Sequence, residues 1–475
     1  MIILNADIGS TYTKLTAIDS VKKEIVATAS SFTTIETDVM EGFRAALKKL
    51  EEQIPAFSYD QLLTCSSAAG GLKMVALGLV PELTSKAARL AAASAGAKVM
   101  KSYAFEISPA EIAEIEAIEP DLVLLSGGTD GGNKEVIIAN ARHLAQINLP
   151  FSIIVAGNKS ATAEVAQILD EAGKSYVITE NVMPEFNQLN IEPAKEQITE
   201  LFISRIIEAK GLHNIQEISK NSIIPTPLAV LDACRLLSKG TKTTDGIGEL
   251  LAVDLGGATT DVYTISDGKP TLENVTVKGL PEPNSKRTVE GDLGMRYSLH
   301  ALADELDLET FSDAIGVTAS QTEEWIKRVS DNPGTLAKAG SDEEKIELGV
   351  ARQAVKIAVE RHSGTYQPVF TPFGQVFALT GKDLSALPYV IGIGGAIINA
   401  VRPEEILDAA RREANDFNYA KPLNPEYLID KKYIFSAMGL LSKEHPEVAL
   451  EIMKKEIKQP QPPPSPKGKE PDGAT

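Results

Sequence analysis

Two segments of the chain alternate apolar and polar positions in the same order. Residues 1–19 read MIILNADIGSTYTKLTAID, and residues 249–266 read ELLAVDLGGATTDVYTIS. Each segment passes from a short apolar run through a polar, glycine-containing loop into a second apolar run. Short, partly β-branched apolar runs are typical of strands that are buried on both faces. Each segment therefore predicts a strand, a tight loop and a second strand.

The two loops share the residue types that suit a phosphate group. Aligning the segments pairs Asp7 with Asp254, Gly9 with Gly256, and Lys14 with Asp261. Glycine lets a backbone approach a ligand closely, and hydroxyl groups add to the exposed amide donors. An ordinary hairpin turn explains either loop alone, but two matched copies favour a phosphate site. The predicted contacts are Gly9, Ser10, Thr11, Lys14, Gly256, Gly257 and Ala258.

An aspartate stands at the end of the first strand in each predicted hairpin. A carboxylate beside a phosphate site cannot hold the anion, but it can hold hydrated Mg²⁺, which takes few protein ligands. Asp7 and Asp254 are therefore the candidate magnesium ligands and catalytic carboxylates. Phosphoryl transfer to water also needs a positioned water molecule, and Thr259 or Asp261 is the candidate to orient it.

A third glycine-rich stretch, LPYVIGIGGAIINAV, spans residues 387–401. Its pattern predicts a buried strand over 389–393, a tight turn, and a helix from Ala396 onward. Bare backbone in such a turn can lie against a ribose or a flat ring, so Gly392, Gly394 and Gly395 are candidate nucleotide contacts. Close packing of the helix on the strand explains the same glycines, and this alternative stays open.

Between the two hairpins, short β-rich runs alternate with helical patterns. The predicted strands cover 99–107, 121–126, 151–156 and 175–179, and the predicted helices cover 109–118, 134–147, 160–172 and 193–210. This alternation predicts a parallel sheet flanked by helices.

Two of these strands end in polar glycine turns, GGTDGG at 127–132 and AGNKS at 156–160. Ligands of open parallel sheets gather at such carboxyl ends, so Asp130, Asn158 and Lys159 form a candidate docking surface or second ligand site. We favour the alternative, in which these residues serve the strand-to-helix turns.

Two later segments are polar. In GDLGMR, residues 291–296, Asp292 is predicted to cap a helix running from Met295 to Asp304. A partner-facing or nucleotide-sensing element containing Glu290, Asp292 and Arg296 is the alternative. Residues 321–362 predict two solvated helices with charged faces.

The length of 475 residues exceeds what one compact core accommodates, so two or three domains are expected. We expect a first lobe at 1–215 with an α/β elaboration at about 90–210, and a second lobe at 216–455. Residues 456–475 are predicted to be a disordered, Pro-rich tail, preceded by a short helix near 445–457.

Charge and composition narrow the classes of partner. A net charge of −18 and a pI near 4.9 repel nucleic acid and anionic lipid, so neither is an expected partner. No apolar run is long enough to span a membrane. Two distant cysteines and the absence of a leader before the first strand point to the cytoplasm. The five histidines sit singly, so no zinc or cobalt site is predicted.

The order of DIGSTYTK, LAVDLGGATTD and VIGIGGAI resembles the phosphate 1, phosphate 2 and adenosine motifs of the superfamily of actin, the Hsp70 chaperones and the sugar kinases. The resemblance implies an α/β fold in which two RNase H-like lobes close over MgATP, with an α/β parallel-sheet elaboration in the first half. It also gives the repeated hairpins a reason, because each lobe contributes one.

A narrower resemblance rests on residues 62–84, LLTCSSAAGGLKMVALGLVPELT, and on LLSGGTDGG, IPTPLAVLDACRLL and RTVEGDLGMR. Together these resemble the glutamate mutase accessory family known as GlmL or MutL. The resemblance implies an ATPase that reactivates or chaperones an adenosylcobalamin-dependent mutase of the glutamate mutase or aminomutase type, with the mutase subunits as partners. The implied action is lobe motion, driven by ATP, that releases damaged cobalamin.

The chain has no Asp-x-His-x-x-Gly segment, so we expect it to act on a cobalamin enzyme without itself carrying the cofactor. A small-molecule kinase and an actin-like assembly ATPase are the alternatives, since both share the predicted cleft. The sequence also leaves a homo-oligomer open.

Overall fold

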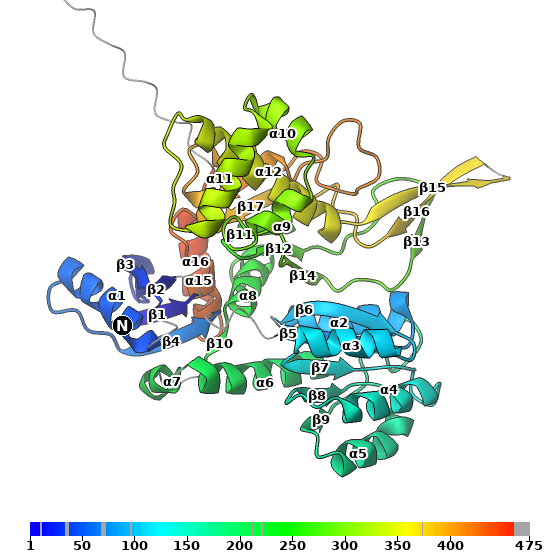
Figure 1. Cartoon of the computed structure of the whole chain (residues 1–475). Coiled ribbons are helices and arrows are strands. Elements are labelled where there is room, and N and C mark those ends of the chain that lie inside the picture. The colour runs from blue at the N-terminus through cyan, green and yellow to red at the C-terminus, as the bar shows by residue number, and fades with distance from the viewer. Residues whose placement is uncertain are drawn as a thin grey trace, which may run out of the picture.

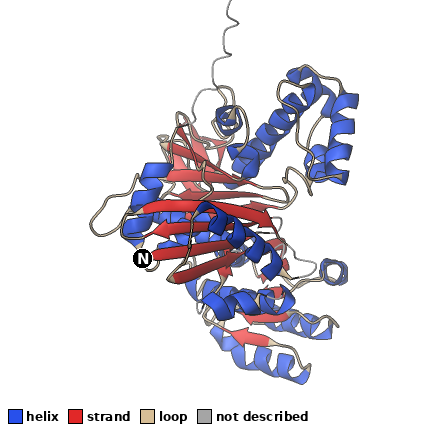
Figure 2. Ribbon diagram, turned by 90° about the vertical axis from the view of Figure 1, so that its left-hand side faces the viewer, coloured by secondary structure: helices blue, strands red, loops and turns tan. Residues whose placement is uncertain are grey.

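The computed structural model describes residues 1–9, 12–33, 38–67, 73–95, 97–210, 212–219, 222–372 and 374–459. Strands of these residues form three five-stranded sheets and one three-stranded sheet, and helices pack around and between them (Figures 1 and 2). The protein is therefore a mixed α/β structure with parallel strand pairs, as predicted.

The first lobe is built on a sheet whose strand order is β10-β4-β1-β2-β3. Strands β1, β2 and β3 are antiparallel neighbours, while β4 and β10 continue the sheet in parallel with β1. Helix α1 (Val39–Gln53) packs on this sheet and starts at Asp38, whose side chain accepts a hydrogen bond from the Met40 amide. The strands are β1 (Ile2–Ile8), β2 (Tyr12–Asp19), β3 (Glu24–Phe32), β4 (Gln61–Ser66) and β10 (Ile224–Pro225).

The second lobe repeats this topology with the order β14-β12-β11-β17-β18. Again three antiparallel strands are followed by two parallel ones. Its strands are β11 (Leu250–Leu255), β12 (Thr260–Ile265), β14 (Ser285–Glu290), β17 (Tyr389–Ile393) and β18 (Glu426–Ile429). Its helices are α9 (Leu299–Asp304), α10 (Leu308–Ile315), α11 (Ala319–Asp331), α12 (Asp342–His362), α13 (Gly395–Ile398) and α14 (Pro403–Asp408). The same strand order in both lobes confirms the predicted pair of RNase H-like lobes.

Three helices lie between the two sheets and join them into one core (Figure 1). They are α8 (Thr226–Lys239), α15 (Phe435–Leu441) and α16 (Pro446–Glu456). Ile3 of the first sheet and Leu250 of the second belong to the same buried cluster as these helices. Helices α8 and α15 cross so closely that a Cβ atom on Gly439 would lie 1.7 Å from the Ala229 carbonyl oxygen.

A separate α/β domain is inserted between β4 and β10. Its sheet is wholly parallel, with the order β6-β5-β7-β8-β9. The strands are β5 (Lys73–Gly78), β6 (Lys98–Ala104), β7 (Leu122–Leu125), β8 (Ser152–Val155) and β9 (Tyr176–Ile178). The helices are a π-helical turn η1 (Pro81–Ser85), α2 (Lys86–Ser94), α3 (Pro109–Ile118), α4 (Glu135–Gln146), the short turn η2 (Lys159–Ala161) and α5 (Thr162–Glu171). The predicted parallel sheet is therefore present.

The boundaries differ from the expected ones at two places. Strand β5 begins at residue 73, ahead of the expected start near 90, and it lies between β6 and β7 of the parallel sheet. Helices α6 (Glu192–Lys210) and α7 (His213–Ser219) lead the chain back to β10. The expected boundary at 215/216 thus falls within α7, and the first sheet takes its last strand from beyond it.

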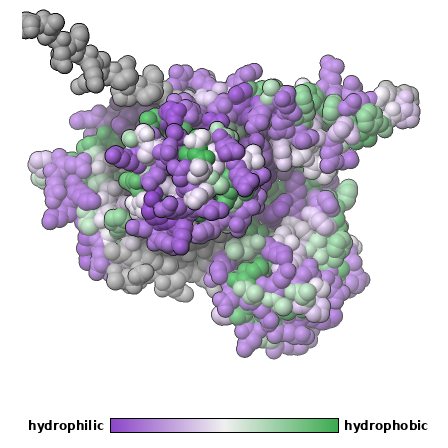
Figure 3. Space-filling model, turned by 45° about the horizontal axis from the view of Figure 1, so that its top comes forward, coloured by the Kyte–Doolittle hydropathy of each residue, from purple (hydrophilic) through white to green (hydrophobic). Residues whose placement is uncertain are grey.

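A three-stranded arm extends from the second lobe (Figure 1). It contains β13 (Val275–Lys278), β15 (Thr365–Thr371) and β16 (Gly374–Thr380). Elsewhere on the face drawn in Figure 3, hydrophilic side chains predominate and hydrophobic ones form small groups. Within the described ranges, no helix is long and apolar enough to cross a membrane. Helix α16 agrees with the helix expected near 445–457. The tail predicted to be disordered from 456 is ordered at its start, because Glu456 ends α16 and Lys458 forms a bridge with Ile429. Its remainder, from 460 onward, lies outside the described residues.

Candidate functional site

The two hairpins have the same register. Asp7 faces Lys14 across β1 and β2, and Asp254 faces Asp261 across β11 and β12. Both loops close alike: the Gly9 amide donates to the Tyr12 carbonyl at 3.0 Å, and the Gly256 amide donates to the Thr259 carbonyl at 2.9 Å. The correspondence predicted from the sequence is therefore present in the folded chain.

A cleft of about 1580 Å³ opens between the lobes and brings most of the predicted residues together. Its lining includes Asp7, Gly9, Lys14, Asp254, Gly256, Gly257, Ala258, Thr259, Asp261 and Gly395. The predicted contacts Ser10 and Thr11 lie outside the described residues.

The three glycines predicted to contact the nucleotide, Gly392, Gly394 and Gly395, have different surroundings. A Cβ atom on Gly392 would meet the side chains of Ile397 and Leu407, so this glycine serves the packing of helices on β17. Gly394 has a φ of +87°, and a Cβ there would lie 2.5 Å from Oδ1 of Asp254. Gly394 therefore allows the second-lobe aspartate its position, while Gly395 lines the cleft.

The first-lobe aspartate is fixed by hydroxyl groups from the helices between the lobes. Oδ1 of Asp7 accepts a hydrogen bond from Thr226 at 2.8 Å, and Oδ2 accepts one from Ser436 at 3.0 Å. Thr226 is the first residue of α8, and Ser436 lies in the first turn of α15. Asp7 is only 7% exposed, so its carboxylate is held in one orientation.

Lys14 carries a positive charge from the first lobe into an acidic part of the cleft. Its Nζ lies 2.9 Å from the centroid of the Tyr433 ring, a cation–π contact with the second lobe. Burial lowers the pKa of Lys14, and the neighbouring carboxylates of Asp7, Asp254 and Asp430 oppose this change. The lysine thus neutralises charge from both lobes.

Asp430 was not found by sequence analysis. It follows β18, and its Oδ2 accepts hydrogen bonds from the amides of Ile434 at 2.7 Å and Phe435 at 3.0 Å. Burial raises its pKa to about 6, although these bonds act in the opposite direction. A lone aspartate after a short strand gives no local signal, so only the fold reveals its place near Lys14.

The second-lobe aspartate is electrostatically unlike Asp7. Burial raises the pKa of Asp254 to about 7, and the facing carboxylate of Asp261 adds to the effect. No hydrogen-bond donor reaches the Asp254 side chain within the described part of the chain. Asp261, in contrast, accepts from Arg287 at 2.8 Å through Nε and at 2.6 Å through Nη2. Asp254 is therefore the carboxylate that a bound cation would stabilise most.

The segment 291–298 supports the loop of the second hairpin. The amides of Met295 and Arg296 donate to the carbonyls of Gly256 and Gly257, and the Ser298 hydroxyl donates to that of Ala258. A Cβ atom on Gly294 would lie 2.4 Å from the Ala258 carbonyl carbon. This support was not predicted.

The predicted helix cap at Asp292 is wrong. The helix begins at Leu299, and Asp292 instead pairs with Arg361 at 2.8 Å. Arg361 also pairs with Glu290 at 3.0 Å, so this acidic pair secures the end of β14 to α12. The ion pairs are tertiary contacts that outweigh the local capping pattern.

Helix α11 buries Trp325 and Ile326, so its predicted solvation is only partly correct. The same holds for helix α12. One face is buried through Ile346, Val350 and Val355, because the helix packs on the second sheet. Glu347 of α12 lines the cleft and pairs with Arg296 of the supporting segment at 2.5 Å. The helix therefore supplies one wall of the cleft.

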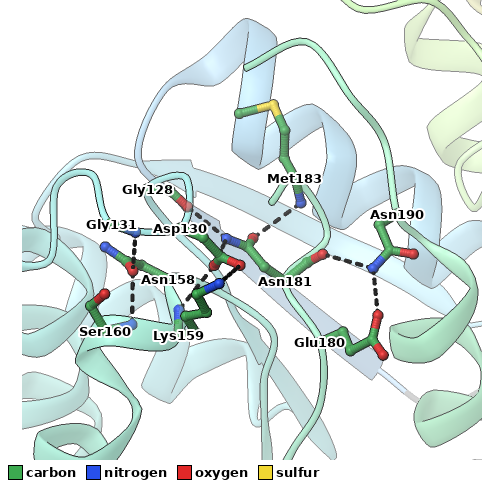
Figure 4. A network of polar contacts seen from close by, with 10 residues as sticks. All are labelled: Gly128, Asp130, Gly131, Asn158, Lys159, Ser160, Glu180, Asn181, Met183 and Asn190. Carbon is green, nitrogen blue, oxygen red and sulfur yellow. Dashed lines mark hydrogen bonds and ion pairs between the residues drawn. The ribbon is translucent and has the colours of Figure 1, made fainter. Parts of the chain in front are cut away.

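The polar turns of the α/β domain satisfy one another (Figure 4). Oδ1 of Asn158 accepts from the amides of Gly131 and Ser160, and its Nδ2 donates to the Gly132 and Asn133 carbonyls. Asp130 accepts from the Lys159 amide and from Asn181 Nδ2, both at 3.0 Å. These residues thus stabilise the strand-to-helix turns, which is the alternative favoured from the sequence.

Comparison with known proteins gives the family of the chain. The family model described as MutL protein matches residues 3–457. Protein MutL of Clostridium tetanomorphum is 46% identical over 451 residues, which cover 94% of this chain and 97% of the relative.

Solved structures align over most of the chain with low TM-scores. The activator of 2-hydroxyisocaproyl-CoA dehydratase from Clostridium difficile, with bound ADPNP, is 12% identical, with 97% of this chain and 100% of that chain covered and a TM-score of 0.29. A gluconate kinase from Lactobacillus acidophilus is 9% identical, with 98% and 94% covered and a TM-score of 0.34.

The repeated strand order and the cleft between the two sheets define a two-lobed α/β protein of the actin, Hsp70 and sugar-kinase type. Within that class, the family match and the relative identify the chain as a member of the MutL protein family.

Proposed function

We propose that the protein is an ATPase that reactivates or chaperones an adenosylcobalamin-dependent mutase of the glutamate mutase or aminomutase type. The observation that carries the proposal is the pair of matched hairpins, which present Asp7 and Asp254 from separate lobes to one cleft. A triphosphate held by both loops would make contacts that only a closed cleft satisfies.

The loops fit the phosphates of ATP. Gly257 and Ala258 line the cleft, and their amides have no acceptor within the described residues. Such free amides, together with the Lys14 ammonium group, supply local positive potential in a chain whose net charge is −18. The second-lobe wall, with Glu347 and Gly395, is the proposed position of the nucleoside.

The carboxylates fit Mg²⁺. Asp254 has a raised pKa near 7, no donor in the described chain and a second carboxylate opposite, and a divalent cation relieves all three conditions. Asp254 and Asp7 would hold the ion, which supplies neutralisation of phosphate charge when bound. Thr259 donates to Asp261 at 3.2 Å, so this pair is placed to orient a water molecule beside the phosphates.

Lobe motion is the proposed output. Loss of the terminal phosphate would remove contacts that hold the hairpins together, and the lobes would relax around the helices that lie between their sheets. Membership of the MutL family supports a mutase as the protein on which this motion acts. The motion would loosen the mutase around a damaged cobalamin, so that a fresh cofactor can replace it.

The test has two stages. Calorimetry with ATP is run with Mg²⁺ and again with EDTA, and ATP hydrolysis is followed by phosphate release. A glutamate mutase inactivated during turnover is then incubated with this protein, MgATP and fresh adenosylcobalamin. We expect mutase activity to return only with the wild-type protein and ATP. Hydrolysis without recovery would contradict the reactivating role, and no MgATP binding would contradict the whole proposal.

The variant Asp254→Asn is the matched control for both stages. It keeps the shape of the side chain and removes the charge that the cation needs. Recovery of mutase activity with this variant at the wild-type rate would also count against the proposal.

A further inference from the structure

Helix α2 ties the α/β domain to the second lobe, although the chain inserts that domain into the first lobe. The insertion lies between β4 and β10 of the first sheet, while α2 packs against β14 of the second. Leu280 of the second lobe is buried in the same cluster as Ala87 and Ala91 of α2. The small alanine side chains allow this close approach. The domain therefore bridges the two lobes, one covalently and one through side chains.

The first end of α2 is held by a buried ion pair. Lys86 Nζ lies 2.9 Å from Oε1 of Glu282, and Lys286 Nζ lies 2.7 Å from Oε2. The side chains of Lys86 and Glu282 are 13% and 5% exposed. Buried charges have strict geometric demands, because separating them leaves an uncompensated charge in the interior. The start of α2 is thus held to the loop before β14.

The last turn of α2 is held by Arg287. Nη1 of this arginine donates to the Ala93 carbonyl at 3.1 Å and to the Ala97 carbonyl at 3.5 Å. Carbonyl groups at a helix C-terminus carry partial negative charge and favour a cation. The other donors, Nε and Nη2, both bond Oδ1 of Asp261. One buried guanidinium therefore contacts a cleft carboxylate on one side and the α/β domain on the other.

We infer that Arg287 is a positioning residue that couples the nucleotide cleft to helix α2, so that the α/β domain responds to nucleotide bound between the lobes. The inference rests on the proposed function, because it requires the cleft to bind ATP. A planar guanidinium has fixed donor directions. Any shift of Asp261 that accompanies ligand binding therefore changes the bonds that the same group makes to α2. The coupling is reciprocal, so a protein bound to the α/β domain also changes nucleotide affinity.

Hydrogen exchange of the full-length protein tests the coupling, with Mg²⁺ and the non-hydrolysable analogue AMPPNP as the probe. In the wild-type protein we expect the analogue to change the exchange rates of α2 amides by about fivefold or more. Lys86→Met breaks the first link while Lys286 still neutralises Glu282. Arg287→Lys keeps a cation beside Asp261 but loses the planar guanidinium group, whose several donors reach Asp261 and α2 at once. Both variants are expected to reduce the change to less than about twofold.

Lys101→Met is the matched control, because Lys101 lies in the same domain and pairs with Glu114 on the surface, where both side chains are 47% exposed. This variant should respond like the wild type. Calorimetry with AMPPNP separates the two proposals. Binding to the wild type without a change in α2, or an unchanged response in both linked variants, would overturn the coupling alone. Failure of the wild type to bind would overturn the proposed function and the coupling with it.

Discussion

The two hairpins share a backbone and differ in charge. In the first, the strand-end Asp7 faces Lys14, so the pair is neutral. In the second, Asp254 faces Asp261, so two carboxylates stand opposite one another. Arg287 offsets only Asp261, and the pKa of Asp254 rises to about 7.

The difference assigns separate tasks to two copies of one motif. The first hairpin brings its own cation and is braced by Thr226 and Ser436, so it is complete before a ligand arrives. The second hairpin has no cation of its own for Asp254, and Lys14, which is shared with Asp7 and Asp430, offsets its charge only in part. We therefore propose that Mg²⁺ binds mainly to the second lobe and that Asp7 helps to hold it through geometry more than through charge.

Replacing the two aspartates in turn is the strongest test of this asymmetry. Asp254→Asn should lower the rate of ATP hydrolysis by about 100-fold, because the main cation ligand is lost. Asp7→Asn should have a smaller effect, about tenfold, since Lys14 and the two hydroxyl groups remain. Phosphate release at saturating MgATP measures both. Equal losses in the two variants would contradict separate roles for the hairpins.

Gly394→Ala perturbs the second hairpin without adding or removing a charged group. The new Cβ would lie 2.5 Å from Oδ1 of Asp254, at a φ of +87° that alanine rarely adopts. We expect a loss of about 2 kcal/mol in the free energy of unfolding, measured by urea denaturation. Gly395→Ala is the matched control, because a Cβ there would lie 3.7 Å from Asn399 Nδ2 and the φ of Gly395 is not positive. A loss of equal size in the control would show that position 394 has no special constraint.

The pH dependence of magnesium binding sharpens the comparison further. Because the pKa of Asp254 is about 7, a proton competes with the cation below that pH. Magnesium affinity in the presence of AMPPNP should fall by about tenfold for each pH unit below 7 and level off above it. Calorimetry from pH 5.5 to pH 8.5 measures this curve. A slope that persists in Asp254→Asn would assign the titration to another group.

Thr226→Val should have the smallest effect. It removes one of the two hydroxyl donors to Asp7 and keeps the side-chain shape, so the free energy of unfolding should fall by about 1 kcal/mol. Ser436→Ala removes the other donor, and the double variant completes a mutant cycle by thermal or urea denaturation. Full additivity of the two losses would contradict a shared brace on one carboxylate.

Much of the fold could be predicted because its signals are local. The hairpins, the parallel sheet and the turn residue Asn158 all show in short runs of sequence, where strand periodicity and capping chemistry operate. Strand β5 was missed because its apolar run is short and periodicity alone does not identify a strand that is buried on both faces. The cap at Asp292 failed because Arg361, distant in sequence, offered a stronger partner.

The site was predictable where two copies could be aligned and not elsewhere. Asp7, Lys14, Asp254 and Asp261 were found through their repeated spacing, and the fold places them in one cleft. Asp430, Tyr433 and Arg287 belong to no repeated motif, and they reach the others only through the sheet order and the crossing helices. Such residues depend on long-range topology, which single-sequence patterns do not contain.

The contact between Gly439 and Ala229 bears on the lobe motion proposed above. At this crossing the backbones of α8 and α15 meet with no intervening Cβ on Gly439, so no side chain is available there to change rotamer and permit sliding. Two helices whose backbones are in close contact at one crossing rotate about it more readily than they slide past each other. We therefore propose that this crossing is the pivot of the lobe motion proposed above.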